Sequence, residues 1–291
     1  LMTISAKIIA DSVSSEGIRL TTFQLRYPRI VHSELMTHRV FSRGASSSRA
    51  IPISRSIKDI LRDPAEPVAW GSNKPGMQAG AELTGIRRTL ARMAWHGTKR
   101  CAILGARVSQ WAGAHKQVAN RILEPWSHIS VVVTSTDYEN WFALRCHPNA
   151  DPTLKALADA MFEARKKSIP LTLQPGQWHL PYITERDRRD HEGDIEVLKK
   201  ISAARCARVS YNNHDGRRST LGEDEKLFEY LVADAPVHAS PTEHQATPDK
   251  RWSRNRWAKP ELHGNFRGWI QFRKTLPGEA VYEPQPWEMA A

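Results

Sequence analysis

The chain has 291 residues, of which 40% are hydrophobic, and its formal net charge is +11. That length allows one large or two small domains, and no apolar run approaches the ~20 residues that a membrane span needs. Three well-separated cysteines and the lack of a signal-peptide pattern at residues 1–3 predict a cytoplasmic setting, and they argue against a zinc site built from four cysteines. The positive charge favours anionic partners such as nucleotides or nucleic acid.

Two strands are predicted at the start of the chain. Residues 4–9 and 20–25 have strand composition, and a turn-forming segment at residues 14–17 separates them. A helix is expected to begin near His32 and to end by Gly44.

A polar run at residues 34–49 overlaps this helix and contains one histidine, three arginines and four serines. Each unpaired charge or hydroxyl would cost several kcal/mol in a dry interior. The run therefore predicts either an exposed loop or an anion site, in which guanidiniums and hydroxyls meet phosphate or carboxylate oxygens.

The middle of the chain is predicted to be mainly helical. Residues 63–80 are rich in proline and glycine and are expected to form a loop, whereas residues 81–112 have apolar side chains at helical spacing. Further helices are expected at 115–123, 137–145, 153–167, 196–208 and 223–233, with a strand at 129–134 and a loop at 170–181. Together these elements predict an α+β fold, in which a small antiparallel sheet near the N-terminus packs with long helices. We expect a single domain over 1–291 that ends in an irregular C-terminal extension at 248–291.

Three later segments combine polar and aromatic residues. The first segment lies in a predicted helix and reads Asn140-Trp141-Phe142-Ala143-Leu144-Arg145. The side chains of Asn140 and Arg145 are expected to diverge by about 140° around the helix axis. The second segment begins in the helix expected at 196–208 and continues past its end. It is Ala204-Arg205-Cys206-Ala207-Arg208-Val209-Ser210-Tyr211. His238-Ala239-Ser240-Pro241-Thr242-Glu243-His244 is typical of a helix start, with serine as N-cap and proline at the first position.

These segments together resemble the flavin-dependent thymidylate synthases. The family signature is Arg-His-Arg, seven residues and then Ser. This chain has a similar pattern, in which His38-Arg39 is followed after seven residues by Ser47 and after one more by Arg49. The segment at 204–211 resembles the family's Ala-Arg-Val-Ser/Cys-Tyr element, and the segment at 238–244 resembles its His-x-Ser/Thr-Pro-x-Glu-His element. In the family those elements precede the signature, whereas here they follow it. The chain therefore resembles a rearranged, circular-permutation-like version of that fold.

The resemblance implies transfer of a one-carbon unit from methylenetetrahydrofolate to C5 of a pyrimidine deoxynucleotide such as dUMP. Reduced FAD would supply the hydride, NADPH is a candidate reductant, and no metal is expected. By resemblance the catalytic residues are Arg145, which would stabilise charge developing on the pyrimidine ring, and His38. The residues expected to bind the nucleotide are Glu34, Arg39, Ser47, Arg49, Arg121 and Arg145. Those expected to bind FAD are His38, Asn140, Ser210, His238, Ser240 and Glu243. Sites of this family lie between the subunits of a homotetramer, so a homo-oligomer is expected.

Departures from the family pattern leave alternatives open. Thr37 replaces the first arginine of the signature, Glu34 stands where glutamine is typical, and Gly44-Ala45 replaces an Asn-Glu pair. These changes permit a pyrimidine nucleotide hydroxymethylase or another nucleotide-modifying relative. A different class, a basic nucleic-acid-binding protein without catalysis, is suggested by ten tryptophans. Three of these, Trp252, Trp257 and Trp269, lie among arginines. Core or interface anchoring is the favoured interpretation of those tryptophans.

Overall fold

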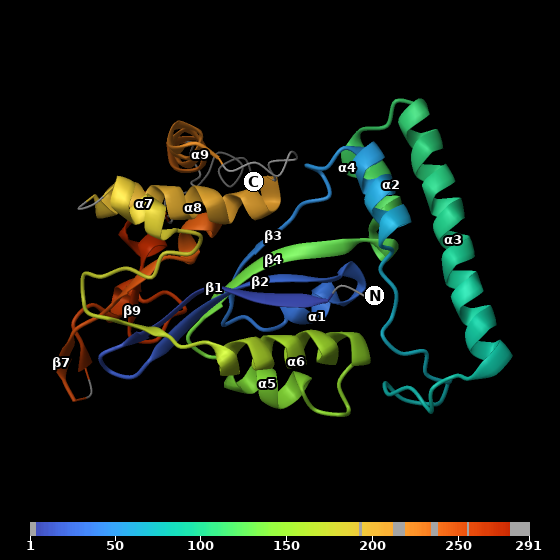
Figure 1. The fold of residues 1–291 in the computed structure, drawn as a ribbon, viewed down its shortest axis with the longest axis horizontal. Coiled ribbons are helices and arrows are strands. Elements are labelled where there is room, and N and C mark those ends of the chain that lie inside the picture. The colour runs from blue at the N-terminus through green and yellow to red at the C-terminus, as the bar shows by residue number, and fades with distance from the viewer. Residues whose placement is uncertain (1–3, 192–193, 212–218, 234–237, 255, 280–291) are drawn as a thin grey trace, which may run out of the picture.

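A computed structural model describes residues 4–191, 194–211, 219–233, 238–254 and 256–279. Its centre is a five-stranded sheet with the order β3-β4-β2-β1-β5 (Figure 1). The strands are β1 (Ser5–Ser14), β2 (Arg19–Pro28), β3 (Ser42–Ala45), β4 (His128–Ser135) and β5 (Leu171–Leu173). All neighbours pair antiparallel except β1 and β5, which run parallel. The predicted hairpin and the strand at 129–134 are confirmed.

One face of the sheet, the α6 face, is apolar. Side chains alternate along β2 and β4, so Phe23, Leu25, Val131 and Val133 point to one side and are fully buried. Below the sheet in Figure 1 lie α5 (Glu139–Arg145) and α6 (Pro152–Lys167), which contribute Trp141, Leu154, Leu157, Ala158 and Met161 to the same core.

The opposite face, the α8 face, is covered by the C-terminal half of the chain. Here α8 (Ile195–Tyr211) contacts β3 and β4, and α9 (Leu221–Ala233) packs on α8. The short helix α7 (Glu185–Asp190) precedes them, and the 3-10 helix η3 (Ser240–Glu243) contacts both β3 and α8. After η3, the C-terminal part of the described chain adds two small two-stranded sheets and two 3-10 helices. The sheets pair β6 (Ala246–Pro248) with β9 (Trp269–Gln271) and β7 (Arg251–Ser253) with β8 (Arg256–Trp257), and the helices are η4 (Pro260–Leu262) and η5 (Phe272–Thr275).

A third group of helices stands beside the sheet (Figure 1). It contains α2 (Ile53–Arg62), α3 (Gly85–Trp111), α4 (Lys116–Ala119) and η2 (Asn120–Trp126), which share a core around Ile57, Ile103 and Trp126. The predicted long helix is confirmed, but its apolar residues do not all face this core. Ile86, Leu90 and Met93 are 75%, 57% and 64% exposed. No helix of the described residues is both long and apolar enough to cross a bilayer.

The polar run at 34–49 folds differently from the prediction. After η1 (Arg29–Val31), α1 (His32–Met36) ends eight residues before Gly44, and Ser42–Ala45 forms the edge strand β3. A strand can carry these polar side chains because they have partners. The Ser42 hydroxyl donates to Asn265 Oδ1 at 3.1 Å, and Arg43 Nη1 donates to the carbonyl of Met36 at 2.6 Å.

Three other expectations also need correction. The N-cap of η3 is Ala239 rather than Ser240, and no side-chain cap is formed there. The loop expected at 170–181 contains β5, which a three-residue strand pattern is too short to reveal. The C-terminal extension is irregular only in part, because β6 and β9 form a small sheet whose Trp269 is fully buried.

Candidate functional site

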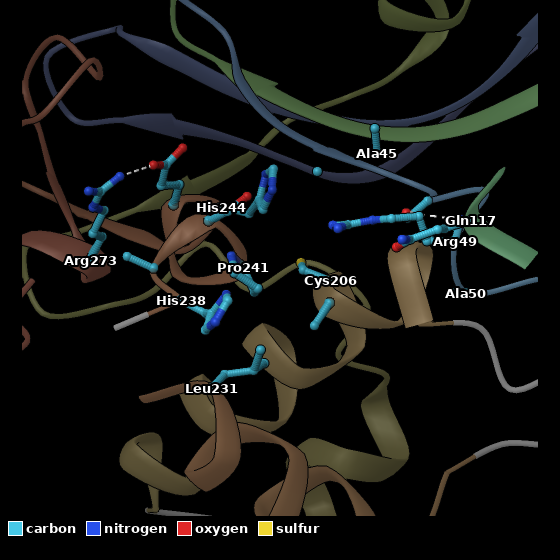
Figure 2. Close-up of a pocket in the computed structure, with 16 residues that line it drawn as sticks. Ala45, Arg49, Ala50, Gln117, Cys206, Leu231, His238, Pro241, His244 and Arg273 are labelled. Carbon is cyan, nitrogen blue, oxygen red and sulfur yellow. Dashed lines mark hydrogen bonds and ion pairs between the residues drawn. The ribbon is translucent and has the colours of Figure 1, made fainter. Parts of the chain in front are cut away.

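A cavity of about 740 Å³ opens between β3, α8 and η3 (Figure 2). Six separate stretches of sequence line it: residues 44–50, Gln117, the α8 residues Cys206 and Ala207, the α9 residue Leu231, residues 238–244, and Arg273. Its volume lies within the ~300–1,000 Å³ range of small-molecule and cofactor sites. The polar side chains that line it are Ser47, Arg49, Gln117, His238, Ser240, Glu243, His244 and Arg273.

Specific contacts hold the walls of the cavity together. The Ser240 hydroxyl donates to the carbonyl of Arg43 at 3.2 Å, which attaches η3 to β3. Glu243 forms an ion pair with Arg273, and Arg273 Nε also donates to Glu279 Oε2 at 2.9 Å. The sequence places Ser240 and Glu243 in one short motif, and the structure directs both toward the same cavity.

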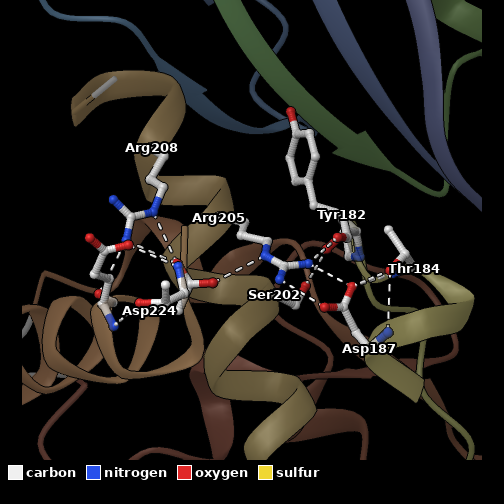
Figure 3. Close-up of polar contacts among 10 residues, drawn as sticks. Tyr182, Thr184, Asp187, Ser202, Arg205, Arg208 and Asp224 are labelled. Carbon is white, nitrogen blue, oxygen red and sulfur yellow. Dashed lines mark hydrogen bonds and ion pairs between the residues drawn. The ribbon is translucent and has the colours of Figure 1, made fainter. Parts of the chain in front are cut away.

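An ion-pair network fixes α8, the helix that forms one wall (Figure 3). Arg205 donates twice to Asp187, at 2.8 and 2.9 Å, and its Nε donates to Asp224 at 3.1 Å. Arg208 Nε donates to the other oxygen of Asp224 at 3.0 Å, and the Asp224 side chain is fully buried. Hydrogen bonds from Arg205 hold the pKa of Asp187 well below its ordinary value, although burial opposes them.

A smaller pocket of about 470 Å³ shares Ser47 and Arg49 with this cavity. It is lined by Arg29, His32, Ser33, Ser47, Ser48, Arg49, Arg121 and Glu124. Three of the predicted nucleotide-binding residues, Ser47, Arg49 and Arg121, therefore lie together, and Ser47 and Arg49 also reach the larger cavity. Two guanidiniums and a hydroxyl in one pocket suit a phosphate group.

Three more of the predicted residues form a separate cluster. Arg145 Nε donates to His38 Nε2 at 3.2 Å, and Arg145 Nη1 lies 3.7 Å from Glu34 Oε2. Burial, together with the nearby Arg145, lowers the pKa of His38, whose ring meets that of Trp141 edge-to-face at 4.7 Å. Burial also raises the pKa of Glu34. Because Nε2 of His38 accepts this bond, the neutral ring carries its hydrogen on Nδ1.

The remaining predicted residues do not join these groups. Arg39 is exposed, and Asn140 is exposed on α5. Ser210 lies in α8, and its side chain is outside the described residues. His38 does not line the cavity either. Of the six residues expected to bind FAD, the cavity brings together His238, Ser240 and Glu243.

Sequence reasoning missed two residues of the cavity. Gln117 had no motif to mark it, and His244, the last residue of the motif at 238–244, was not assigned a ligand. His244 is fully buried and its Nδ1 lies 2.8 Å from Thr134 Oγ1. No local sequence signal marks this burial, because Gln245, Thr247 and Asp249 follow it without an apolar pattern.

Other chemistries find little support in the described residues. No three His, Cys, Asp or Glu side chains there are placed to share a metal ion. Burial raises the pKa of the Cys146 thiol to about 11, with Asp159 adding to the shift. Burial raises the pKa of the cavity residue Cys206 further still. Neither thiol is activated as a nucleophile.

Comparison with known proteins gives only weak likenesses. No protein-family model and no curated protein matches the sequence. Among solved structures, the UMP/dUMP methylase PolB from Streptomyces cacaoi bound with 5-Br UMP overlaps at a TM-score of 0.49 and 15% identity, covering 59% of this chain and 91% of that chain. The same enzyme bound with 5-Br dUMP gives 0.47 and 15%, covering 59% and 92%. Overlaps this weak do not assign a fold or a function.

Proposed function

We propose that this chain is a flavin-dependent enzyme that transfers a one-carbon unit to C5 of a pyrimidine nucleotide. One observation carries the proposal. The segment at 44–50 and the segment at 238–244, far apart in sequence, line one cavity of about 740 Å³. These are the two segments that resemble the nucleotide- and flavin-binding elements of the flavin-dependent thymidylate synthases.

The residues of the cavity fit a flavin nucleotide in charge and in polarity. Arg273, which is paired with Glu243 and Glu279, places a guanidinium on the cavity wall, and the Ser240 hydroxyl and Glu243 supply hydrogen-bonding groups. A fully buried ring nitrogen, Nε2 of His244, has no partner among the described residues and belongs to a side chain on the cavity wall. When bound, FAD would supply hydride chemistry that no side chain can provide.

The resemblance to the family also assigns the nucleotide and the one-carbon donor. Ser47, Arg49 and Arg121 would hold the nucleotide phosphate in the adjoining pocket, and methylenetetrahydrofolate is the proposed donor. Arg145 would stabilise negative charge on the pyrimidine ring, with Glu34 and His38 orienting its guanidinium at 3.7 and 3.2 Å. His38 accepts a hydrogen bond from Arg145 and so keeps its neutral form.

Mass spectrometry of the products tests the reaction directly. Purified protein would be incubated with dUMP or dCMP, methylenetetrahydrofolate, FAD and NADPH. A methylated nucleotide supports the proposal, and a hydroxymethylated one supports the alternative permitted by Thr37 and Ala45. No modified nucleotide from either substrate, with FAD bound, would contradict both.

Steady-state kinetics separate the roles of two arginines. Arg49 would meet a phosphate whose charge is present throughout, so Arg49→Ala should mainly raise the nucleotide KM. Arg145 would meet charge that develops during reaction, so Arg145→Ala should mainly lower kcat, and Arg145→Lys should not restore it. A near wild-type kcat for Arg145→Ala would remove Arg145 from the chemistry.

We also propose a homo-oligomer, with a tetramer as the expected form. Arg145 and His38 do not line the cavity that holds Ser240 and Glu243, so a site that uses all four needs a second copy. Mixing two inactive variants, Arg145→Ala and Ser240→Ala, should then restore part of the activity through subunits that carry one intact half-site. A monomeric mass by light scattering with full activity would contradict the assembly.

Catalysis-free nucleic-acid binding remains the candidate from another class. Trp252 is 71% exposed, and the Arg256 guanidinium lies 4.9 Å from its ring centroid. Trp269, in contrast, is fully buried, which confirms core anchoring for that residue. A colourless protein with salt-dependent affinity for DNA or RNA would favour this alternative.

A further inference from the structure

A continuous line of buried polar side chains crosses the α8 face of the sheet and ends at the cavity. Ser12 Oγ lies 2.9 Å from His179 Nδ1, and His179 Nε2 lies 2.8 Å from Thr22 Oγ1. Thr22 Oγ1 lies 2.8 Å from Thr134 Oγ1, and Thr134 Oγ1 lies 2.8 Å from His244 Nδ1. All five side chains are buried. We call them the Ser12–His244 chain.

The β-sheet register creates this line. Thr22 and Thr134 face each other directly in the β2–β4 pairing, and Ser12 lies on the same face of β1. The two histidines come from outside the sheet, His179 from the loop after β5 and His244 from the end of η3. Both rings are neutral, because burial lowers the pKa of each to about 3.

Counting hydrogens shows that the chain has two complete arrangements. Each hydroxyl and each neutral ring carries one hydrogen, so five hydrogens serve four bonds. If every bond is donated toward His244, both rings carry hydrogen on Nε2, and His244 Nε2–H is left to donate. If every bond is donated toward Ser12, both rings carry hydrogen on Nδ1, His244 Nε2 is left as an acceptor, and the Ser12 hydroxyl directs its own hydrogen out of the chain. Any mixed arrangement loses a bond or leaves the hydroxyl of Thr22 or Thr134, both 0% exposed, without an acceptor.

The end of the chain meets the cavity wall. His244 lines the cavity, and its Nε2 is buried with no hydrogen-bond partner in the described part of the protein (Figure 2). The neighbour on β3 is Gly44, where an added Cβ would lie 3.5 Å from Nε2. The lack of a side chain at Gly44 therefore leaves this nitrogen beside the cavity.

We propose that His244 Nε2 contacts a ring nitrogen of a redox-active heteroaromatic ligand, and that the Ser12–His244 chain lets it act as donor or acceptor. This inference rests on the proposed function, because an isoalloxazine has such a nitrogen. That nitrogen accepts a hydrogen bond in the oxidised ring and donates one, as N–H, in the reduced ring. A side chain that inverts its own polarity satisfies both forms, whereas an Asp carboxylate or a Lys ammonium satisfies one.

Histidine tautomers provide the direct test. Full-length protein labelled with 15N-histidine would be measured by solid-state NMR, with His179→Gln and His244→Gln used to assign the two signals. His179 and His244 should always hold the same tautomer. With oxidised FAD bound both should carry hydrogen on Nε2, and with dithionite-reduced FAD both should carry it on Nδ1. Different tautomers on the two rings, or the same tautomer in both redox states of bound FAD, would overturn the inference.

Thr134 is a positioning residue in this scheme, and its replacement should change a potential. Thr134→Val leaves His244 Nδ1 without a partner, and a buried N–H without a partner is more costly than a lone pair without one. The variant should therefore favour hydrogen on Nε2 and weaken binding of reduced FAD about tenfold relative to oxidised FAD. For a two-electron couple, that ratio lowers the midpoint potential by about 30 mV.

The control is Thr21→Val, which removes an equally buried hydroxyl from the opposite face of β2 and leaves the chain intact. Its midpoint potential should equal that of the wild type. An unchanged potential in Thr134→Val would overturn the role of the chain while leaving the proposed function in place. Absence of FAD binding in an equilibrium titration of the wild type would instead defeat both.

Discussion

The two faces of the central sheet are built from alternate residues of the same strands, yet they differ in chemistry. On the α6 face, Phe23 and Val133 join a core of apolar side chains, and the buried Thr21 hydroxyl on this face donates to Asp11 outside the Ser12–His244 chain. On the α8 face, Thr22 and Thr134 are equally buried but hydrogen-bonded into a polar line that reaches a cavity. The comparison indicates a division of labour, in which the α6 face supplies stability and the α8 face positions polar groups at the candidate site.

The largest expected effect comes from opening the α6 face. Phe23 is fully buried and meets Tyr138 edge-to-face at 5.3 Å between ring centroids. Phe23→Ala should therefore lower the free energy of unfolding by about 3–5 kcal/mol. Denaturant unfolding measures it, and a loss under about 1 kcal/mol would show that this face is not the main source of stability.

The next effect concerns the support of the α8 face. Asp224 is fully buried between Arg205 and Arg208 (Figure 3), so Asp224→Ala should cost about 3 kcal/mol of stability, because Arg208 loses this buried carboxylate and Arg205 keeps only Asp187. The matched control is Asp59→Ala, whose partner Arg62 is exposed on α2, with an expected cost of about 0–1 kcal/mol. Equal costs for the two would mean that the network does not hold α8.

Acid should destabilise the α8 face through its two buried histidines. The unfolded chain protonates histidine near its ordinary pKa of 6.5, whereas burial holds the pKa of folded His179 and His244 at about 3. Between these values the unfolded state binds more protons, so stability falls as the pH falls, by up to about 1.4 kcal/mol per pH unit for each ring. His179→Gln should flatten this slope between pH 7 and 5. An unchanged slope would contradict the buried neutral ring.

The smallest expected change in the free energy of unfolding distinguishes a residue in the middle of the Ser12–His244 chain from a residue at its end. Thr134→Val removes two hydrogen bonds and should cost about 2 kcal/mol, whereas Ser12→Ala removes one and should cost about 1 kcal/mol. Chemical denaturation of both variants checks the order. If the Ser12 variant is the less stable of the two, the hydrogen bonds do not act as a line.

The fold was predictable where hydrophobic periodicity is strong. The β1–β2 hairpin, β4, α3 and α6 lie where their patterns indicate. Strand β3 was not predictable from the sequence. Its four residues, Ser42–Ala45, show no apolar alternation, and they are buried only by partners that are far away in the sequence. The exposed stripe on α3 shows the reverse limit, since periodicity marks an apolar face without showing what covers it.

Part of the candidate site was likewise predictable from the sequence and part was not. Local motifs brought Ser47, Arg49, Ser240 and Glu243 to notice, and the structure places all four around one cavity. Arg273 and His244 depend on contacts made across the fold, Arg273 with Glu243 and His244 with Thr134. Spacing in the sequence carries no trace of such contacts. The separation of Arg145 from the cavity is also a property of the folded chain.

Equilibrium titration of the purified protein with FAD tests the central claim most directly. The cavity should bind oxidised FAD, and Ser240→Ala and Glu243→Ala should each raise the dissociation constant about tenfold to a hundredfold, since a charge-assisted hydrogen bond is worth about 1.5–3 kcal/mol. Glu261→Ala, an exposed carboxylate on η4, should leave it unchanged. Absence of FAD binding at high micromolar concentration, in either redox state, would contradict the account.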